Sequence, residues 1–101
     1  MEITITSENY ESEVLKSDKP VILDFWASWW GACTSLAPSV KELAEENPDI
    51  KVCLANVDEN MDLAREHKVM SIPTVVAFKD GKVVNKVVGP NSKEAILAML
   101  K

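Results

Sequence analysis

Cys33 lies where a thiol can do chemistry, after an apolar strand-like run and at the start of a helical pattern. A thiol in the first turn of a helix faces the positive end of the helix dipole, which favours the thiolate. The preceding residues Trp29, Trp30 and Gly31 do not form a packing pattern, so we expect an exposed aromatic loop that contacts another molecule. The alternative is that one of the two rings packs into the core.

Asp24 is a second candidate, because it interrupts the apolar run 21–27. A run that is apolar on both sides predicts a central strand covered on both faces, so this carboxyl is expected to be buried. A buried carboxylate is costly unless it has a partner or a task, and an aspartate with a raised pKa makes a useful proton acceptor. The alternative is an acid bonded to a hydroxyl, the backbone or water. An apolar replacement is predicted to stabilise the domain at neutral pH.

Packing explains the remaining candidates better than chemistry does. The Ile72–Pro73 bond precedes a predicted strand, and an ordinary trans bond is the base-rate expectation there. Cys53 is read as a small buried hydrophobe on the opposite strand face from Leu54. His67 has charged neighbours and is expected to be a solvated helix end. Because no second histidine or cysteine lies near it in the sequence, no metal site is predicted.

Alternating strand and helix patterns must position these residues. Strands are predicted at 3–6, 21–27, 50–57, 75–78 and 83–88, and helices at 7–16, 32–46, 60–68 and from 92 onward. Ser7, Asn60 and Ser92 are the expected N-caps, and Asp80-Gly81 is a hairpin turn signal. The order βαβαβαββα predicts an α/β layer fold in which crossovers give parallel pairs and the hairpin adds an antiparallel edge.

Composition limits the class of protein. The 101 residues suit one domain, 1–101, and the net charge of −5 without a basic stripe argues against nucleic acid as a partner. No apolar run approaches the roughly 20 residues that span a bilayer, and no secretory leader pattern is visible, so no membrane association is expected. Two cysteines do not make a disulfide framework, and a reducing, cytoplasmic location is expected.

Several spaced motifs together resemble the thioredoxin family. The matching segments are Asp24–Trp29, Gly31–Cys33, Ala37–Pro38, Asn56–Asn60, Ser71–Thr74, Phe78–Gly81 and Gly89, and they extend over essentially the whole chain. The resemblance implies the thioredoxin fold, a central mixed five-stranded sheet flanked by four helices. It also implies a thiol–disulfide oxidoreductase that needs no cofactor and acts on protein or peptide substrates.

The resemblance also implies roles for individual residues. In the family, an exposed first cysteine attacks a substrate disulfide, a second cysteine resolves the mixed disulfide, and a buried aspartate accepts a proton. Carried over, Cys33 is the resolving cysteine, Asp24 the proton acceptor, and Ile72–Pro73 the wall of the substrate groove in a cis-proline loop. The substrate-binding set implied in this way is Trp29, Trp30, Gly31, Ala32, Ile72, Pro73 and Gly89.

The departures from the family pattern bear on activity. Trp30 stands where the attacking cysteine is expected, so dithiol exchange should be impaired. Ala32 replaces the usual proline, which is expected to alter redox poise. Leu54 replaces a lysine near the buried acid, which should make Asp24 harder to ionise.

Three readings follow from this pattern. The first is a thioredoxin whose attacking cysteine was lost by divergence or engineering, for which a thioredoxin-reductase-type partner is not expected. The second is a redox-silent peptide-binding module that uses Trp29, Trp30 and the Ile72–Pro73 groove. The third is self-association, in which an otherwise monomeric chain forms a dimer through the tryptophan face.

Overall fold

A five-stranded mixed sheet forms the centre of the computed structural model, which describes residues 2–101. The strands are β1 (Glu2–Thr4), β2 (Val21–Trp26), β3 (Lys51–Asn56), β4 (Thr74–Lys79) and β5 (Lys82–Val88). Their order is β1-β3-β2-β4-β5; β3 is parallel to β1 and β2, whereas β4 is antiparallel to β2 and β5. This is the mixed α/β sheet that the sequence predicts.

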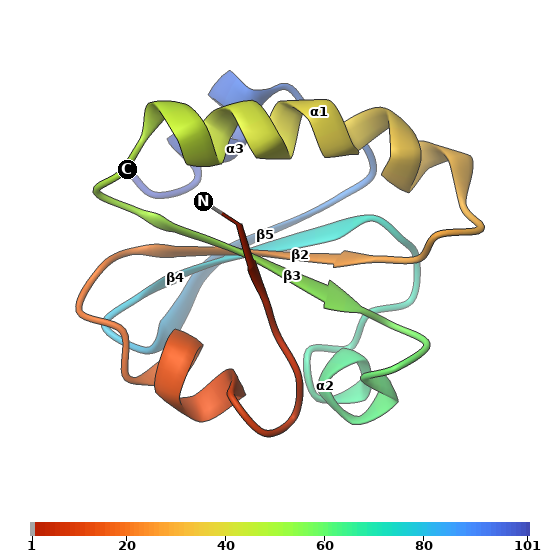
Figure 1. Ribbon diagram of the computed structural model, residues 1–101, viewed down its shortest axis with the longest axis horizontal. Coiled ribbons are helices and arrows are strands. Elements are labelled where there is room, and N and C mark those ends of the chain that lie inside the picture. The colour runs from red at the N-terminus through yellow and green to blue at the C-terminus, as the bar shows by residue number, and fades with distance from the viewer. Residues whose placement is uncertain (1) are drawn as a thin grey trace.

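Helices cover both faces of the sheet, as Figure 1 shows. They are η1 (Glu11–Leu15), α1 (Gly31–Glu46), α2 (Met61–Glu66) and α3 (Lys93–Ala98). In Figure 1, α1 and α3 lie on one face, and the short helix η1 and α2 lie on the other. No helix within residues 2–101 is long and apolar enough to cross a bilayer.

The central strand β2 supplies side chains to two separate cores, and this confirms the prediction of a strand covered on both faces. Leu23 and Phe25 pack into the core on the η1 and α2 side, where Cys53 also lies. Ile22 packs into the core on the α1 and α3 side. Because side chains alternate along a strand, Asp24 belongs to the same face as Ile22 and points toward α1.

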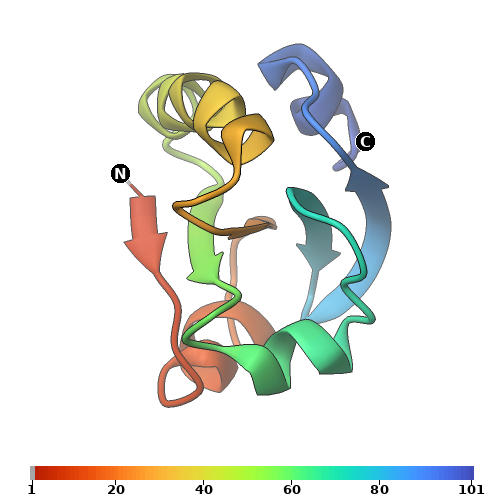
Figure 2. The same cartoon turned by 90° about the vertical axis from the view of Figure 1, so that its right-hand side faces the viewer.

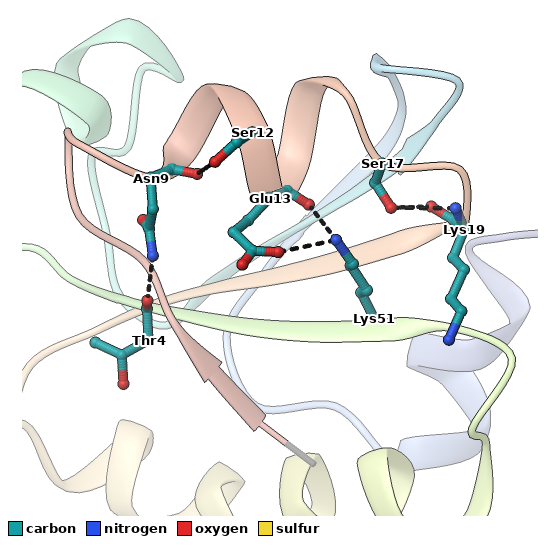
Figure 3. A network of polar contacts seen from close by, with 7 residues as sticks. All are labelled: Thr4, Asn9, Ser12, Glu13, Ser17, Lys19 and Lys51. Carbon is teal, nitrogen blue, oxygen red and sulfur yellow. Dashed lines mark hydrogen bonds and ion pairs between the residues drawn. The ribbon is translucent and has the colours of Figure 1, made fainter.

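The first helix is shorter than predicted and is held by polar contacts to the sheet. Ser7 is not its N-cap, because its hydroxyl instead donates to Oδ2 of Asp62, 2.7 Å away. Lys51 on β3 bonds both the carboxylate (2.9 Å) and the backbone carbonyl (3.1 Å) of Glu13. Asn9 donates to the carbonyl of Thr4 on β1, and Figure 3 shows both attachments.

Of the other two expected N-caps, one caps its helix through its side chain and the other does not. Ser92 caps α3, since its hydroxyl accepts from the amide of Ala95 at 3.1 Å. Asn60 is buried and does not cap α2; its side-chain amide donates to the carbonyls of Ile5 (3.3 Å) and Asn56 (3.0 Å). Buried backbone carbonyls need hydrogen-bond donors, and the side-chain amide of Asn60 serves these two carbonyls. The side chain therefore does not cap α2, contrary to the prediction from the sequence pattern.

Candidate functional site

The loop between β2 and α1 presents the aromatic residues before Cys33. Trp30 is the N-cap residue of α1, and its carbonyl accepts from the amides of Cys33 (3.1 Å) and Thr34 (3.3 Å). Gly31 and Ala32 form the first helical positions, and the carbonyl of Gly31 accepts from the hydroxyl of Ser35. The strand-to-helix junction predicted from the sequence is therefore present, with Cys33 in the first turn of α1.

Both tryptophans are exposed, Trp29 to 64% and Trp30 to 46%. Their rings meet edge to face, with centroids 5.8 Å apart. The indole N–H of Trp29 donates to Oδ2 of Asp58 at 2.7 Å, which fixes that ring at the end of β3. The expectation of an exposed aromatic loop is confirmed, and the alternative that one ring packs into the core is wrong.

Cys33 is buried, and its surroundings disfavour the thiolate form. Only 5% of the residue is exposed, and this burial is the main cause that raises the pKa of its thiol. A backbone hydrogen bond from Ala27 opposes the rise, while the charge of Asp24 adds to it. The thiolate expected from a helix start is therefore disfavoured, because burial outweighs the stabilisation at the helix N-terminus.

Asp24 is buried on the α1 side of β2, with 3% of the residue exposed. The pKa of its carboxyl is raised from 3.8 to about 7, mainly by burial and to a lesser extent by the charge of Glu2. Within residues 2–101, Oδ1 of Asp24 is a buried side-chain oxygen without a hydrogen-bond partner. Its register partner on β3 is Leu54, which offers no donor. The predicted burial is confirmed, and no protein group among residues 2–101 bonds Oδ1.

A pocket of about 690 Å³ brings Asp24 and Cys33 together. It lies between the sheet and the first turns of α1, and it is lined by Glu2, Asp24, Trp26, Ala27, Ser28, Cys33, Thr34, Ala37, Pro38, Lys41 and Leu54. The two chemical groups predicted from the sequence therefore share one cavity. Sequence reasoning missed Ala37 and Lys41 as lining residues, although they follow Cys33 at successive intervals of four residues, which places all three on one helix face.

The proline loop lies at the same end of the molecule. The Ile72–Pro73 bond is cis, as the resemblance implies, and the base-rate expectation of a trans bond is wrong. Pro73 is buried, Ile72 is half-buried, and the carbonyl of Pro73 accepts from the amide of Gly89 at 2.8 Å. Figure 2 shows this loop and the β2–α1 loop facing the viewer together.

Cys53 lies on the other side of the sheet from Cys33. It is fully buried in the core beside η1 and α2, and burial raises the pKa of its thiol to about 12. Leu54 packs with the opposite core, as the alternation predicts. The sheet therefore separates the two cysteines of the chain.

His67 is not a solvated helix end, contrary to the expectation from its charged neighbours. Only 11% of its side chain is exposed, and its ring packs against Phe25 and Phe78 with centroids 5.5 Å from each. Its Nε2 is hydrogen-bonded to the hydroxyl of Tyr10 at 2.6 Å. Burial lowers the pKa of the imidazole, which disfavours its protonated form. No cluster of potential metal ligands occurs among the described residues.

Comparison with known proteins identifies the family of this chain. The thioredoxin family model matches residues 1–101. A thioredoxin of Mycobacterium tuberculosis is 43% identical over 99 residues, which cover 97% of this chain and 85% of the relative. Thioredoxins of Streptomyces clavuligerus (42%, 92% of this chain, 87% of the relative) and Pseudomonas aeruginosa (41%, 97% and 92%) are similar to it at comparable levels. The chain belongs to the thioredoxin family of thiol–disulfide oxidoreductases.

Proposed function

We propose that this chain is a thioredoxin-family protein that cannot complete dithiol exchange by itself. The main support for this proposal is the position of Trp30. It lies directly before α1, where the family pattern expects the attacking cysteine. The only thiol left in the loop is Cys33, which is buried and has a raised pKa. Its residual role in this proposal is that of the resolving thiol, with Asp24 as proton acceptor.

Thiol–disulfide exchange needs two thiols that can reach one another. A thiolate attacks a substrate sulfur, a mixed disulfide forms, and a second thiol of the enzyme then releases the reduced substrate. Cys53 is unable to serve as that second thiol, because it is buried on the far side of the sheet. A reductase that recharges an enzyme disulfide is accordingly not a proposed partner, and free thiols fit a reducing, cytoplasmic compartment.

Insulin reduction with dithiothreitol tests this proposal. Trp30→Cys is compared with the unchanged protein, and the double variant Trp30→Cys with Cys33→Ser is the matched control. We expect precipitation of the insulin B chain above background with Trp30→Cys alone. Activity of the unchanged protein would overturn the proposal, since Cys33 would then be acting without a partner thiol. Inactivity of Trp30→Cys would show that the scaffold itself has lost reductase chemistry.

Peptide binding without redox chemistry is the second candidate function. Trp29 and Trp30 expose large apolar rings. The β2–α1 loop that carries them lies at the same end of the molecule as the cis-proline loop (Figure 2). Tryptophan is enriched among the residues that dominate binding energy at interfaces. The proposed partner is an extended peptide or protein segment that lies along Ile72 and Pro73 and contacts the two rings.

A cysteine-free peptide containing apolar and aromatic residues is the probe for this candidate, with binding followed by tryptophan fluorescence. Trp30→Ser is expected to weaken binding about tenfold or more, whereas Cys33→Ser leaves it unchanged. Val84→Ser is the matched control, because Val84 on β5 has a similar exposure of 48%. Equal binding by Trp30→Ser and Val84→Ser would refute the peptide-binding module.

A further inference from the structure

The pocket beside Asp24 has the size and shape of a small-molecule site. Its volume of about 690 Å³ lies within the range of roughly 300–1,000 Å³ typical of ligand sites. Its walls are mainly apolar, formed by Ala27, Ala37, Pro38 and Leu54 together with the ring of Trp26. The exposed rings of Trp29 and Trp30 and the proline loop do not line it, so it is separate from the proposed peptide groove.

Asp24 lines this pocket, and Oδ1 of its carboxyl is buried without a hydrogen-bond partner among residues 2–101. Buried polar atoms in proteins are bonded in the great majority of cases, and leaving one unpaired costs about 1–3 kcal/mol. Leu54 lies opposite Asp24 in the sheet register and has no group to donate. A ligand in the pocket that donates a hydrogen bond to the Asp24 carboxylate would supply a partner that no side chain of residues 2–101 supplies to Oδ1.

The charges around Asp24 favour a cationic donor. The titratable groups that line the pocket with it are Glu2 from β1, and Cys33 and Lys41 from α1. Glu2 contributes a second negative charge, which raises the pKa of Asp24. Lys41 is exposed and forms no ion pair with either carboxyl within the described part of the chain. A compact ammonium group can pair with the carboxylate of Asp24 and offset the repulsion between the two carboxylates.

We propose that this pocket binds a small apolar molecule carrying one protonated amine, with the ammonium donating to the carboxylate of Asp24 and the apolar body against Ala37, Pro38 and Leu54. The ammonium pairs with the ionised carboxylate, so binding is coupled to deprotonation of Asp24. Affinity is therefore highest above the pH at which Asp24 ionises and falls about tenfold for each pH unit below it.

Amide NMR titration with 2-phenylethylammonium chloride at about pH 8 tests the proposal directly, because Asp24, whose pKa is about 7, is then mostly ionised. We expect the largest shifts at the indole of Trp26 and the amides of Ala37 and Leu54. The neutral isostere 2-phenylethanol should bind at least about tenfold more weakly. Equal affinity for the amine and the alcohol, or shifts confined to Trp29 and Trp30, would overturn the proposal.

Two variants separate the role of Asp24 from general effects on folding. Asp24→Asn should weaken amine binding about tenfold or more and remove its pH dependence, while the exposed matched control Asp49→Asn keeps both. Leu54→Lys places the chain's own ammonium at the register partner of Asp24 and should exclude the ligand. Thermal unfolding confirms that each variant is folded. Unchanged binding by Asp24→Asn and Leu54→Lys would overturn the proposal.

Discussion

Asp24 opposes folding at neutral pH, because its charged form is costly in the interior. Its folded-state pKa of about 7 lies above the ordinary value of 3.8. The folded protein therefore holds this proton more tightly than the unfolded chain does. The associated stability is fully present below about pH 4 and is lost as the pH rises through about 7. A shift of this size corresponds to about 4 kcal/mol at most.

Asp24→Leu should therefore stabilise the domain in a pH-dependent manner. Relative to the unchanged protein, the free energy of unfolding is expected to gain about 2–4 kcal/mol more near pH 8 than near pH 4. Urea unfolding at a series of pH values measures this difference. A variant that is less stable at neutral pH would contradict the assignment of Asp24 as an uncompensated buried acid.

The hydrogen bond between Tyr10 and His67 should contribute measurably to stability, because both side chains are largely buried. Tyr10→Phe is expected to lower the free energy of unfolding by about 1 kcal/mol near neutral pH, as it leaves Nε2 of His67 unpaired. Ser12→Ala is the control, since it removes an exposed hydroxyl and should change stability by less than about 0.5 kcal/mol. Equal effects of the two substitutions in urea unfolding would contradict this view.

His67 adds a pH dependence opposite in sign to that of Asp24. Burial holds the folded-state pKa of the imidazole below 6.5, so the unfolded chain binds this proton more readily. The stability due to neutral His67 is present above about pH 6.5 and is lost as the pH falls below that value. In an Asp24→Leu background, the loss of stability on mild acidification should become visible, and His67→Phe should reduce it.

At the scale of elements, the hairpin between β4 and β5 depends on one glycine. Asp80 and Gly81 both have positive φ angles, 53° and 77°, as a tight two-residue turn requires. A Cβ atom at Gly81 would also collide with the backbone carbonyl of Leu15, at the end of η1. This turn therefore joins the hairpin to the first helix.

Gly81→Ala is expected to destabilise the domain by about 1–3 kcal/mol, because it combines the cost of a positive φ with a backbone collision. Gly31→Ala provides the matched control, since a Cβ there meets no atom within 4 Å and lies at the start of a helix. The control should change stability by about 0.5 kcal/mol or less. Thermal unfolding that ranks the two variants equally would show that the turn does not constrain the fold.

The strongest elements were predictable from local sequence, and the caps were less so. The β2 run, the long helix with Pro38 inside it and the Asp80-Gly81 turn all occur where the pattern indicated. Ser7 and Asn60 match the cap pattern equally well, but each bonds a segment distant in sequence instead. Local propensity contains no information about such distant partners.

In the candidate site, too, some features follow from the local sequence and others depend on contacts between distant segments. The burial of Asp24 and the exposure of Trp29 and Trp30 followed from residue type and position. The environment of His67 did not follow, because its partners come from the N-cap of η1, from β2 and from β4, whereas its sequence neighbours are charged. Glu2 likewise reaches the pocket only through the pairing of β1 with β3, which no local pattern specifies.

The whole molecule is expected to be a monomer in solution. A net charge of −5 disfavours close approach of two copies at low ionic strength. Sedimentation velocity should give a single species of 11.2 kDa at micromolar concentration. A concentration-dependent dimer that Trp30→Ser abolishes would instead support self-association through the tryptophan face.

All three tryptophans, Trp26, Trp29 and Trp30, lie within five consecutive residues at one end of the molecule. Intrinsic emission therefore reports on that end alone, whereas the circular dichroism of the backbone averages over every helix and strand. Unfolding curves from the two signals should coincide if the domain unfolds in one step. Emission that changes at a lower urea concentration would instead show that the end bearing Cys33 opens while the remainder of the sheet is still intact.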